Sequence, residues 1–175
     1  MGDTQISGQF VGAFVESAGL VSPVFEKKAM DVLESNGVSE VDPEAWYSTE
    51  KFSNAIHQIE REAGEKTSER AGIQMIEIIP ELSGLPSIED AIEIAQQQQR
   101  ESYKNFSPEV AGQIRQERLD NGNIRIAYFG GWDYPEAFTR GIIRGFAQGT
   151  EARNSVETEA VTTRDDETHA FEIVE

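Results

Sequence analysis

The sequence contains no cysteine, which excludes disulfide bonds, cysteine–zinc sites and a thiol nucleophile, and leaves the redox compartment open. It also lacks any apolar run near the ~18 residues that a membrane-spanning helix needs, so no membrane span is expected. The first ten residues carry no basic residue ahead of an apolar stretch, unlike a secretory signal. Neither a Gly-x-x-x-x-Gly-Lys phosphate loop nor a Gly-x-Ser-x-Gly nucleophile motif occurs.

Positive charge is scarce. The 175 residues include 32 acidic and 15 basic side chains, which gives a formal net charge of −17, and only five of the basic residues are lysines. Such a field repels phosphate backbones and anionic membrane surfaces, so we expect no nucleic-acid partner. One interpretation is an ordinary acidic soluble protein. The other is adaptation to molar salt, where a Debye length of about 3 Å screens self-repulsion. In this respect the chain resembles the proteins of a salt-accumulating archaeon, which implies a cytoplasmic location.

Groups that would hold a metal or do acid–base work are few. The sequence has two histidines, His57 on a predicted helix and His169 on a predicted terminal strand, and we expect a structural role for both. The acidic groups at 60–65 and 165–167 lack the spacing of a calcium loop and are interpreted as solvated carboxylates. The sequence therefore predicts no catalytic residue, no metal and no resident cofactor.

The first part of the chain is predicted to be helical. Apolar spacing, caps and breakers indicate about five helices. They are expected at Gln9–Leu20, from Pro23 to near Gly37, from Asp42-Pro43-Glu44 to Gly64, from Thr67 to about Ile79, and from Ser87 to about Tyr103. The glutamines at 96–99 are interpreted as a solvated helical face.

After residue 108 the pattern changes to strands. Extended stretches at Val110–Leu119 and Ile124–Phe129 flank Asn121-Gly122, the strongest short-range hairpin signal. A helix then starts at Tyr134-Pro135-Glu136, and two further strands, 154–163 and 168–174, meet at Asp165-Asp166. Gly141 and Gly145 let that helix approach a neighbour closely, and we expect this neighbour to be the sheet.

The order of elements predicts an α+β fold in one domain, residues 1–175. Its helical part covers about 8–106, and its sheet part, about 109–175, is a β-β-α-β-β antiparallel sheet with one helix packed on it.

Aromatic residues at junctions between elements are the best candidates for a binding site. Trp46, Tyr47, Trp132 and Tyr134 lie at such junctions rather than within periodic stripes. In a fold with a pocket, residues in these places line the ligand site or close its mouth; the alternative is that they pack the helical part against the sheet. His57, beside the apolar face of its helix, is the fifth candidate. For Arg140 two roles remain possible: it could bind an anionic ligand, or it could form an ion pair with one of the many carboxylates of the chain.

Three stretches carry a family resemblance. Asp42-Pro43-Glu44-Ala45-Trp46-Tyr47, the run from Tyr134-Pro135-Glu136 to Gly145-Phe146-Ala147, and the turn from Asp165 into Phe171-Glu172-Ile173-Val174 resemble the 4-vinyl-reductase domain family. Its superfamily includes haem nitric-oxide-binding domains and Golgi-transport tethering subunits. The resemblance covers roughly residues 8 to 175. It implies a helical part and a sheet crossed by a helix, enclosing an apolar pocket.

Departures from the family pattern argue against haem. Haem nitric-oxide-binding domains carry a Tyr-x-Ser-x-Arg signature, whereas the comparable stretch here runs from Tyr128 to Trp132 with glycines between, so the serine and arginine are missing. Those domains also use a histidine before the sheet as the iron ligand, and this sequence has no histidine between Ile59 and Glu167. The cysteine-held metal cluster of vinyl-reductase-like proteins is excluded as well.

The sequence thus favours a non-enzymatic ligand-binding or sensory domain that encloses a small hydrophobic molecule without haem. Two alternatives stay open. One is a homodimeric interaction protein of the tethering type, with the segment Phe10–Val15 or an edge strand as its contact. The other is an accessory reductase of pigment chemistry.

Overall fold

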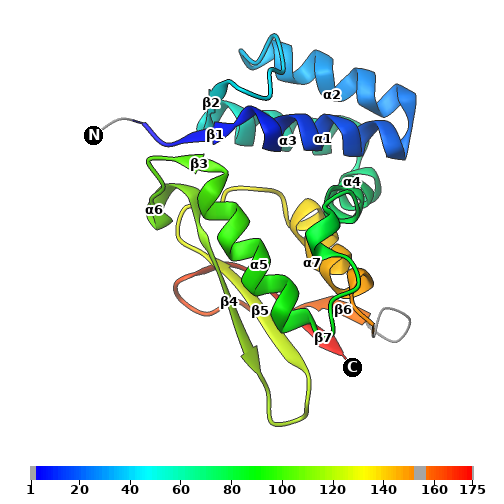
Figure 1. Ribbon diagram of the computed structural model, residues 1–175, viewed down its shortest axis with the longest axis vertical. Helices are drawn as coiled ribbons and strands as arrows, with labels where there is room; N and C mark the ends of the chain where they lie inside the picture. The colour runs from blue at the N-terminus through cyan, green and yellow to red at the C-terminus, as the bar shows by residue number, and fades with distance from the viewer. Residues whose placement is uncertain (1–2, 152–156, 175) are drawn as a thin grey trace.

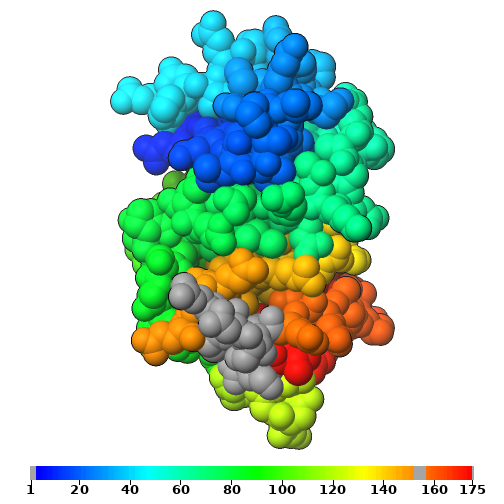
Figure 2. All heavy atoms as spheres, turned by 90° about the vertical axis from the view of Figure 1, so that its right-hand side faces the viewer, coloured from blue at the N-terminus to red at the C-terminus, as the bar shows by residue number. Residues whose placement is uncertain are grey.

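The computed structural model describes residues 3–151 and 157–174 and has an α+β fold, as predicted. Helices form one end of the molecule, and the hairpin loop between β4 and β5 forms the other (Figures 1 and 2). The helices are α1 (Gly8–Val21), α2 (Pro23–Ser35), α3 (Thr49–Ala63), α4 (Glu65–Glu77), α5 (Ile88–Glu101), α6 (Pro108–Ala111) and α7 (Glu136–Gly149), with a 3-10 turn at Pro80–Leu82. The strands are β1 (Gln5–Ser7), β2 (Trp46–Ser48), β3 (Tyr103–Lys104), β4 (Gln113–Arg118), β5 (Ile124–Phe129), β6 (Glu157–Ala160) and β7 (Glu167–Val174).

Serine caps set the starts of several helices. The hydroxyl of Ser22 accepts the backbone N–H of Phe25 at 3.1 Å, with Pro23 as the first helical residue of α2. The hydroxyl of Ser87 accepts the N–H of Asp90 at 3.2 Å at the start of α5. Both starts follow the sequence prediction because the caps are local signals.

The predicted helix start at Asp42 is wrong. The Asp42 carboxylate accepts the N–H of Glu44 at 2.9 Å, which closes a turn instead of capping a helix. The chain then runs through the short strand β2, and α3 begins directly after it, at Thr49, where the Ser48 hydroxyl accepts the N–H of Lys51 at 3.3 Å. Beyond that point the predicted apolar face and the stop at Gly64 are confirmed.

A small antiparallel sheet of order β2-β1-β3 was not predicted. Its strands have two or three residues, too few for an alternating pattern to be recognisable. Ile6 in the central strand is completely buried and pairs with both Tyr47 and Tyr103. Through the pairing of β1 with β3, this sheet connects residues 5–7 to the segment that follows α5.

The main sheet is antiparallel, with strand order β4-β5-β7-β6, and so joins both predicted hairpins. Its apolar face includes the cross-strand pairs Ile124–Ile173 and Ile126–Phe171. The opposite face carries charged side chains, among them the buried ion pair between Arg125 and Glu167 at 2.6 Å. Part of the strand predicted at 154–163 lies outside the described residues.

The close neighbour of α7 is the helix α4, not the sheet as predicted. A Cβ at Gly141 would collide with the carbonyl oxygen of Glu69, and a Cβ at Gly145 would lie 2.6 Å from the Cβ of Ile76. Gly72 meets the backbone of α7 in the same way from the α4 side. Small residues therefore sit where the two helices cross, and this crossing brings the apolar residues of α4 and α7 together.

Aromatic rings connect the helical part with the sheet part. Phe14 of α1 packs edge-on against Phe52 of α3 and against Phe138 of α7, both at 5.8 Å between ring centres. Phe14 and Phe52 are buried, and they belong to one continuous apolar core. Among the described residues, no helix combines the length and apolar character needed to cross a bilayer.

Candidate functional site

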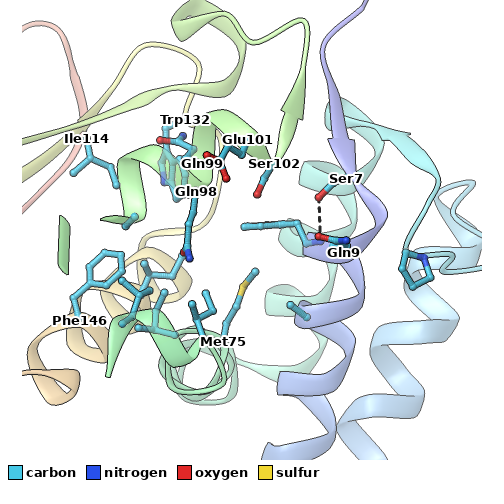
Figure 3. Close-up of a pocket in the computed structure, with 18 of the residues that line it drawn as sticks. Ser7, Gln9, Met75, Gln98, Gln99, Glu101, Ser102, Ile114, Trp132 and Phe146 are labelled. Atoms are coloured by element: carbon cyan, nitrogen blue, oxygen red, sulfur yellow. Dashed lines mark hydrogen bonds between the residues drawn. The ribbon is translucent and has the colours of Figure 1, made fainter. Parts of the chain in front are cut away.

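A cavity of about 540 Å³ lies between the helical part and the sheet part. Its volume falls within the range of pockets that bind small molecules. It is bounded by the start of α1, the loop before β2, α4, α5, β4, β5 and α7 (Figure 3).

One side of the cavity is apolar. Its lining residues come from α4, the 3-10 turn, α7 and β4, and are Met75, Ile76, Ile79, Leu82, Ile142, Phe146 and Ile114. Helical spacing explains why Ile142 and Phe146 face the same space, since residues three or four apart share one face of a helix. The tight crossing at Gly145 lets Ile76 approach α7.

An aromatic pair forms a wall of the cavity. The rings of Tyr128 on β5 and Trp132 in the following loop lie 4.3 Å apart, centre to centre. The indole N–H of Trp132 donates to the hydroxyl of Thr139 at 3.0 Å, and that hydroxyl donates to the carbonyl of Pro135 at 2.9 Å. These bonds hold the indole in one orientation, so the wall is preformed.

Tyr128 carries a hydroxyl that is buried and has no hydrogen-bond partner in the part of the chain that is described. Leaving such a group unpaired costs about 1–3 kcal/mol. Burial also raises the pKa of Tyr128, so the phenol stays neutral and keeps its proton as a donor. Tyr128 is one of the residues around the cavity, but its hydroxyl is enclosed by protein and is not exposed to the cavity.

The other side of the cavity is polar. Its lining comes from the start of α1, the loop before β2 and the end of α5, and includes Ser7, Gln9, Glu44, Gln98, Glu101 and Ser102. Figure 3 shows Ser7, Gln9, Glu101 and Ser102 on the side away from Phe146. Within the described chain, the lining residues include no lysine, arginine or histidine.

Two of the five predicted site residues line this cavity. Trp132 is buried in its wall, and Trp46, 38% exposed, lies at its mouth. Both were selected because they lie at junctions between elements, and these two junctions meet at the cavity.

The other three predicted site residues lie elsewhere. The hydroxyl of Tyr47 donates to the carbonyl of Glu40 and accepts the N–H of Asp42, so it braces the loop before β2. Tyr134 is buried, with its hydroxyl 3.3 Å from that of Tyr103, beside a separate smaller hollow of about 270 Å³. Burial raises the pKa of Tyr103 to about 12.

His57 is a partly exposed histidine whose partner is Asp133. Its Nε2 lies 3.0 Å from a carboxylate oxygen of Asp133. The Ser53 hydroxyl donates to the other carboxylate oxygen at 3.0 Å. The carboxylate thus lies between serine and imidazole, an order in which the imidazole does not take the serine proton.

Sequence reasoning missed the α5 residues of the site. Gln96 donates to the carbonyl of Ile114 in β4 at 2.8 Å and Gln99 to that of Ala111 in α6 at 3.2 Å, so these two glutamines face the protein rather than solvent. Only Gln97 in this run is exposed. The available signal was the helical spacing of Ala91, Ala95 and Gln99, which continues the buried face of α5.

Arg140 is engaged by carboxylates of the chain itself. Its guanidinium lies 3.0 Å from Glu69, which also pairs with Arg144. The sequence allowed either an anionic ligand or a carboxylate of the chain as the partner of Arg140, and the structure shows the carboxylate. Across the described residues, no three acidic or histidine side chains converge as a metal site would require.

Comparison with solved structures shows that the chain has the fold of H-NOX domains. A mutant of the H-NOX of T. Tengcongensis matches with a TM-score of 0.67 and 14% identity over 96% of this chain and 95% of that one. A Cs H-NOX mutant with an unnatural amino acid matches at 0.65 and 14%, over 96% and 94%. An oxygen-binding H-NOX domain related to soluble guanylate cyclases matches at 0.63 and 13%, over 96% and 93%. No protein-family model matches the sequence, and no curated protein does.

The fold therefore raises the question of haem, which the descriptions of two similar structures name, one of them for the H-NOX family. Haem iron is held by histidine, cysteine, methionine or tyrosinate. Among the described lining residues, only Met75, Tyr128 and carboxylates could be considered, and burial keeps Tyr128 protonated. The described lining also offers no cation to pair with two haem propionates, and it includes two further carboxylates, Glu44 and Glu101. The residues of this cavity do not fit haem.

Proposed function

We propose that this chain is a haem-free sensory or ligand-binding domain that holds a small, largely hydrophobic molecule in the cavity between its helical and sheet parts. The observation that carries the proposal is the cavity of about 540 Å³, with its apolar side and the fixed indole of Trp132 in its wall. The fold supports the same class of function, because one of its structural neighbours is described as oxygen-binding.

The ligand is expected to lie against Trp132, with Trp46 at the mouth. Tyr47, His57 and Tyr134 each have a hydrogen-bond partner elsewhere in the chain. We propose that they support the surrounding loops rather than contact the ligand. The relationship to the 4-vinyl-reductase family and the cytoplasmic location stay predictions.

Nile red, a neutral hydrophobic dye, is a suitable first probe. We expect its fluorescence to rise on binding to the protein, and we expect Ala95→Phe to abolish the rise because Ala95 lines the cavity. Ala160→Phe is the matched control, since Ala160 is exposed on β6. Equal dye binding by the two variants, or none by the unmodified protein, would overturn the proposal.

Native mass spectrometry after purification in high salt tests the same proposal without a dye. A mass a few hundred daltons above 19.4 kDa supports a retained ligand. Adding hemin tests the haem-free part: we expect no absorption spectrum of bound haem, and stoichiometric binding with such a spectrum would contradict it.

A dimeric interaction protein is the second candidate. It is favoured by the exposure of Leu20 and Val24, 55% and 80%, at the corner between α1 and α2. The predicted contact segment Phe10–Val15 is less suited to this role because Val11 and Phe14 are buried. A clean dimer mass with nothing bound would support this candidate over the first.

A further inference from the structure

We propose that the cavity selects apolar molecules with a positively charged head group, such as a primary ammonium, over those with a carboxylate. This inference rests on the proposed ligand-binding function and adds the chemical class of the ligand.

The cavity is two-sided, which orients an amphiphile. Apolar residues of α4 and α7 line one side, while the polar residues of α1, the loop before β2 and α5 line the other (Figure 3). Glu44, Trp46 and Glu101 are exposed, so they mark where the cavity opens to solvent. An amphiphile lowers its free energy by placing its hydrocarbon body against Phe146 and Met75 and its head at this mouth.

The charges at the mouth are negative. Glu44 and Glu101 both line it, and the described lining residues include no cationic side chain; Lys104, beside Trp46 but outside the lining, offsets at most one of the two charges. The partner of the Glu101 carboxylate is the amide N–H of Gln97, at 3.1 Å, which carries no charge. An ammonium head there would gain charge-assisted hydrogen bonds, whereas a carboxylate head would meet two like charges.

An aromatic ring at the same mouth already attracts a cation. The ammonium of Lys104, which is exposed and outside the lining, lies 6.0 Å from the centre of the Trp46 ring. This distance is the outer range of a cation–π interaction. With Lys104 beside the ring, the two carboxylates still leave the mouth negative, and the net charge of −17 reinforces the preference for a cation at longer range.

Competition with Nile red by three ligands of one chain length tests the inference. The ligands are dodecylamine, dodecanol and dodecanoate, each used below the concentration at which it forms micelles. The measurement is made at the lowest potassium chloride concentration at which the fold is retained. We expect dodecylamine to displace the dye at a concentration about tenfold lower than dodecanoate, the size expected from two exposed ion pairs.

Charge-removing variants assign the preference to residues. Replacing Glu44 and Glu101 together by glutamine is expected to remove most of the difference between amine and carboxylate while leaving dodecanol unchanged. Glu93→Gln, on the exposed face of α5, removes a charge without touching the cavity and is expected to keep the preference.

The outcomes separate the two proposals. Dodecanoate displacing the dye as well as dodecylamine would overturn the charge preference while the ligand-binding function stands. An unchanged preference in the double variant would also overturn the inference, because it would trace the effect to net charge alone. Failure of all three ligands together with failure of the dye would overturn the proposed function itself.

Discussion

The ring of Tyr128 lies 4.3 Å from the indole of Trp132, centre to centre, while its hydroxyl has no partner among the described residues. Stacking and hydrogen bonding can therefore be separated at this position. Tyr128→Phe keeps the ring and its stacking and removes only the unpaired hydroxyl.

We expect Tyr128→Phe to raise the free energy of unfolding of the ligand-free protein by about 1 kcal/mol, because it removes a buried unsatisfied group. Tyr134→Phe is the matched control and should have the opposite sign, since it leaves the hydroxyl of Tyr103 without its 3.3 Å partner. Urea unfolding monitored by circular dichroism measures both. Equal destabilisation by the two variants would mean that the Tyr128 hydroxyl is satisfied in the native protein.

The crossing of α4 and α7 gives a second prediction. Gly141→Ala places a methyl group against the carbonyl oxygen of Glu69, a backbone atom that cannot move aside without shifting α4. We expect it to lower the free energy of unfolding by about 2 kcal/mol or more, in the range measured for overpacked cores. Dye binding should fall as well, because this crossing positions one side of the cavity.

Gly12→Ala is the control for helix propensity. A Cβ at Gly12 would lie 3.7 Å from the Cγ1 of Val41, an ordinary contact. Replacing this glycine should therefore stabilise α1 by up to about 1 kcal/mol. Destabilisation by both alanine variants would contradict the claim that the backbone approach is specific to Gly141.

Much of the fold follows from local signals in the sequence. Ser22-Pro23, the capping box at Ser87 and the turn at Asn121-Gly122 each act within four residues, so their outcome does not depend on the rest of the chain. The turn at Asp42 shows the limit of such signals. A cap followed by proline also fits a turn, and the pairing of β2 with β1 decided between them.

Less of the cavity could be predicted. Aromatic residues at junctions were a fair signal for Trp46 and Trp132, but Tyr47 and Tyr134 have the same signal and turn to other partners. Which junction aromatics face the cavity depends on tertiary packing. The contribution of α5 was missed because glutamines are polar, although Gln99 uses its amide to bond a backbone carbonyl.

The ion pair on the outer face of the sheet predicts an acid-labile contribution to stability. The Arg125 guanidinium, hydrogen-bonded to the Glu167 carboxylate, lowers the pKa of Glu167 to about 2 from an ordinary value of 4.5. Because the folded-state pKa is the lower one, the contribution is complete above about pH 4.5 and is lost as the pH falls toward 2. It amounts to about 3 kcal/mol.

The difference in free energy of unfolding between the unmodified protein and Glu167→Gln isolates this contribution from other carboxylates. We expect this difference to shrink as the pH is lowered from 5 toward 2. Urea unfolding at each pH measures it. If Glu167→Gln leaves Arg125 too poorly compensated to fold, replacing both residues by leucine provides a pH-insensitive reference. A difference that does not change with pH would contradict the prediction.

The net charge of −17 predicts that folding depends on the salt concentration. Exposed ion pairs such as Arg115–Asp166 and Arg164–Glu117, each at 3.0 Å, gain little in water and are screened by salt, so their loss costs little. Repulsion among the excess carboxylates is screened by the same ions. Screening of the carboxylate repulsion outweighs screening of the ion pairs, because the 32 acidic side chains outnumber the 15 basic ones. We therefore expect the fold, followed by circular dichroism from about 0.1 M to molar potassium chloride, to be lost at the low end. A signal that is native across the whole range would show that the chain is an ordinary acidic protein rather than a salt-adapted one.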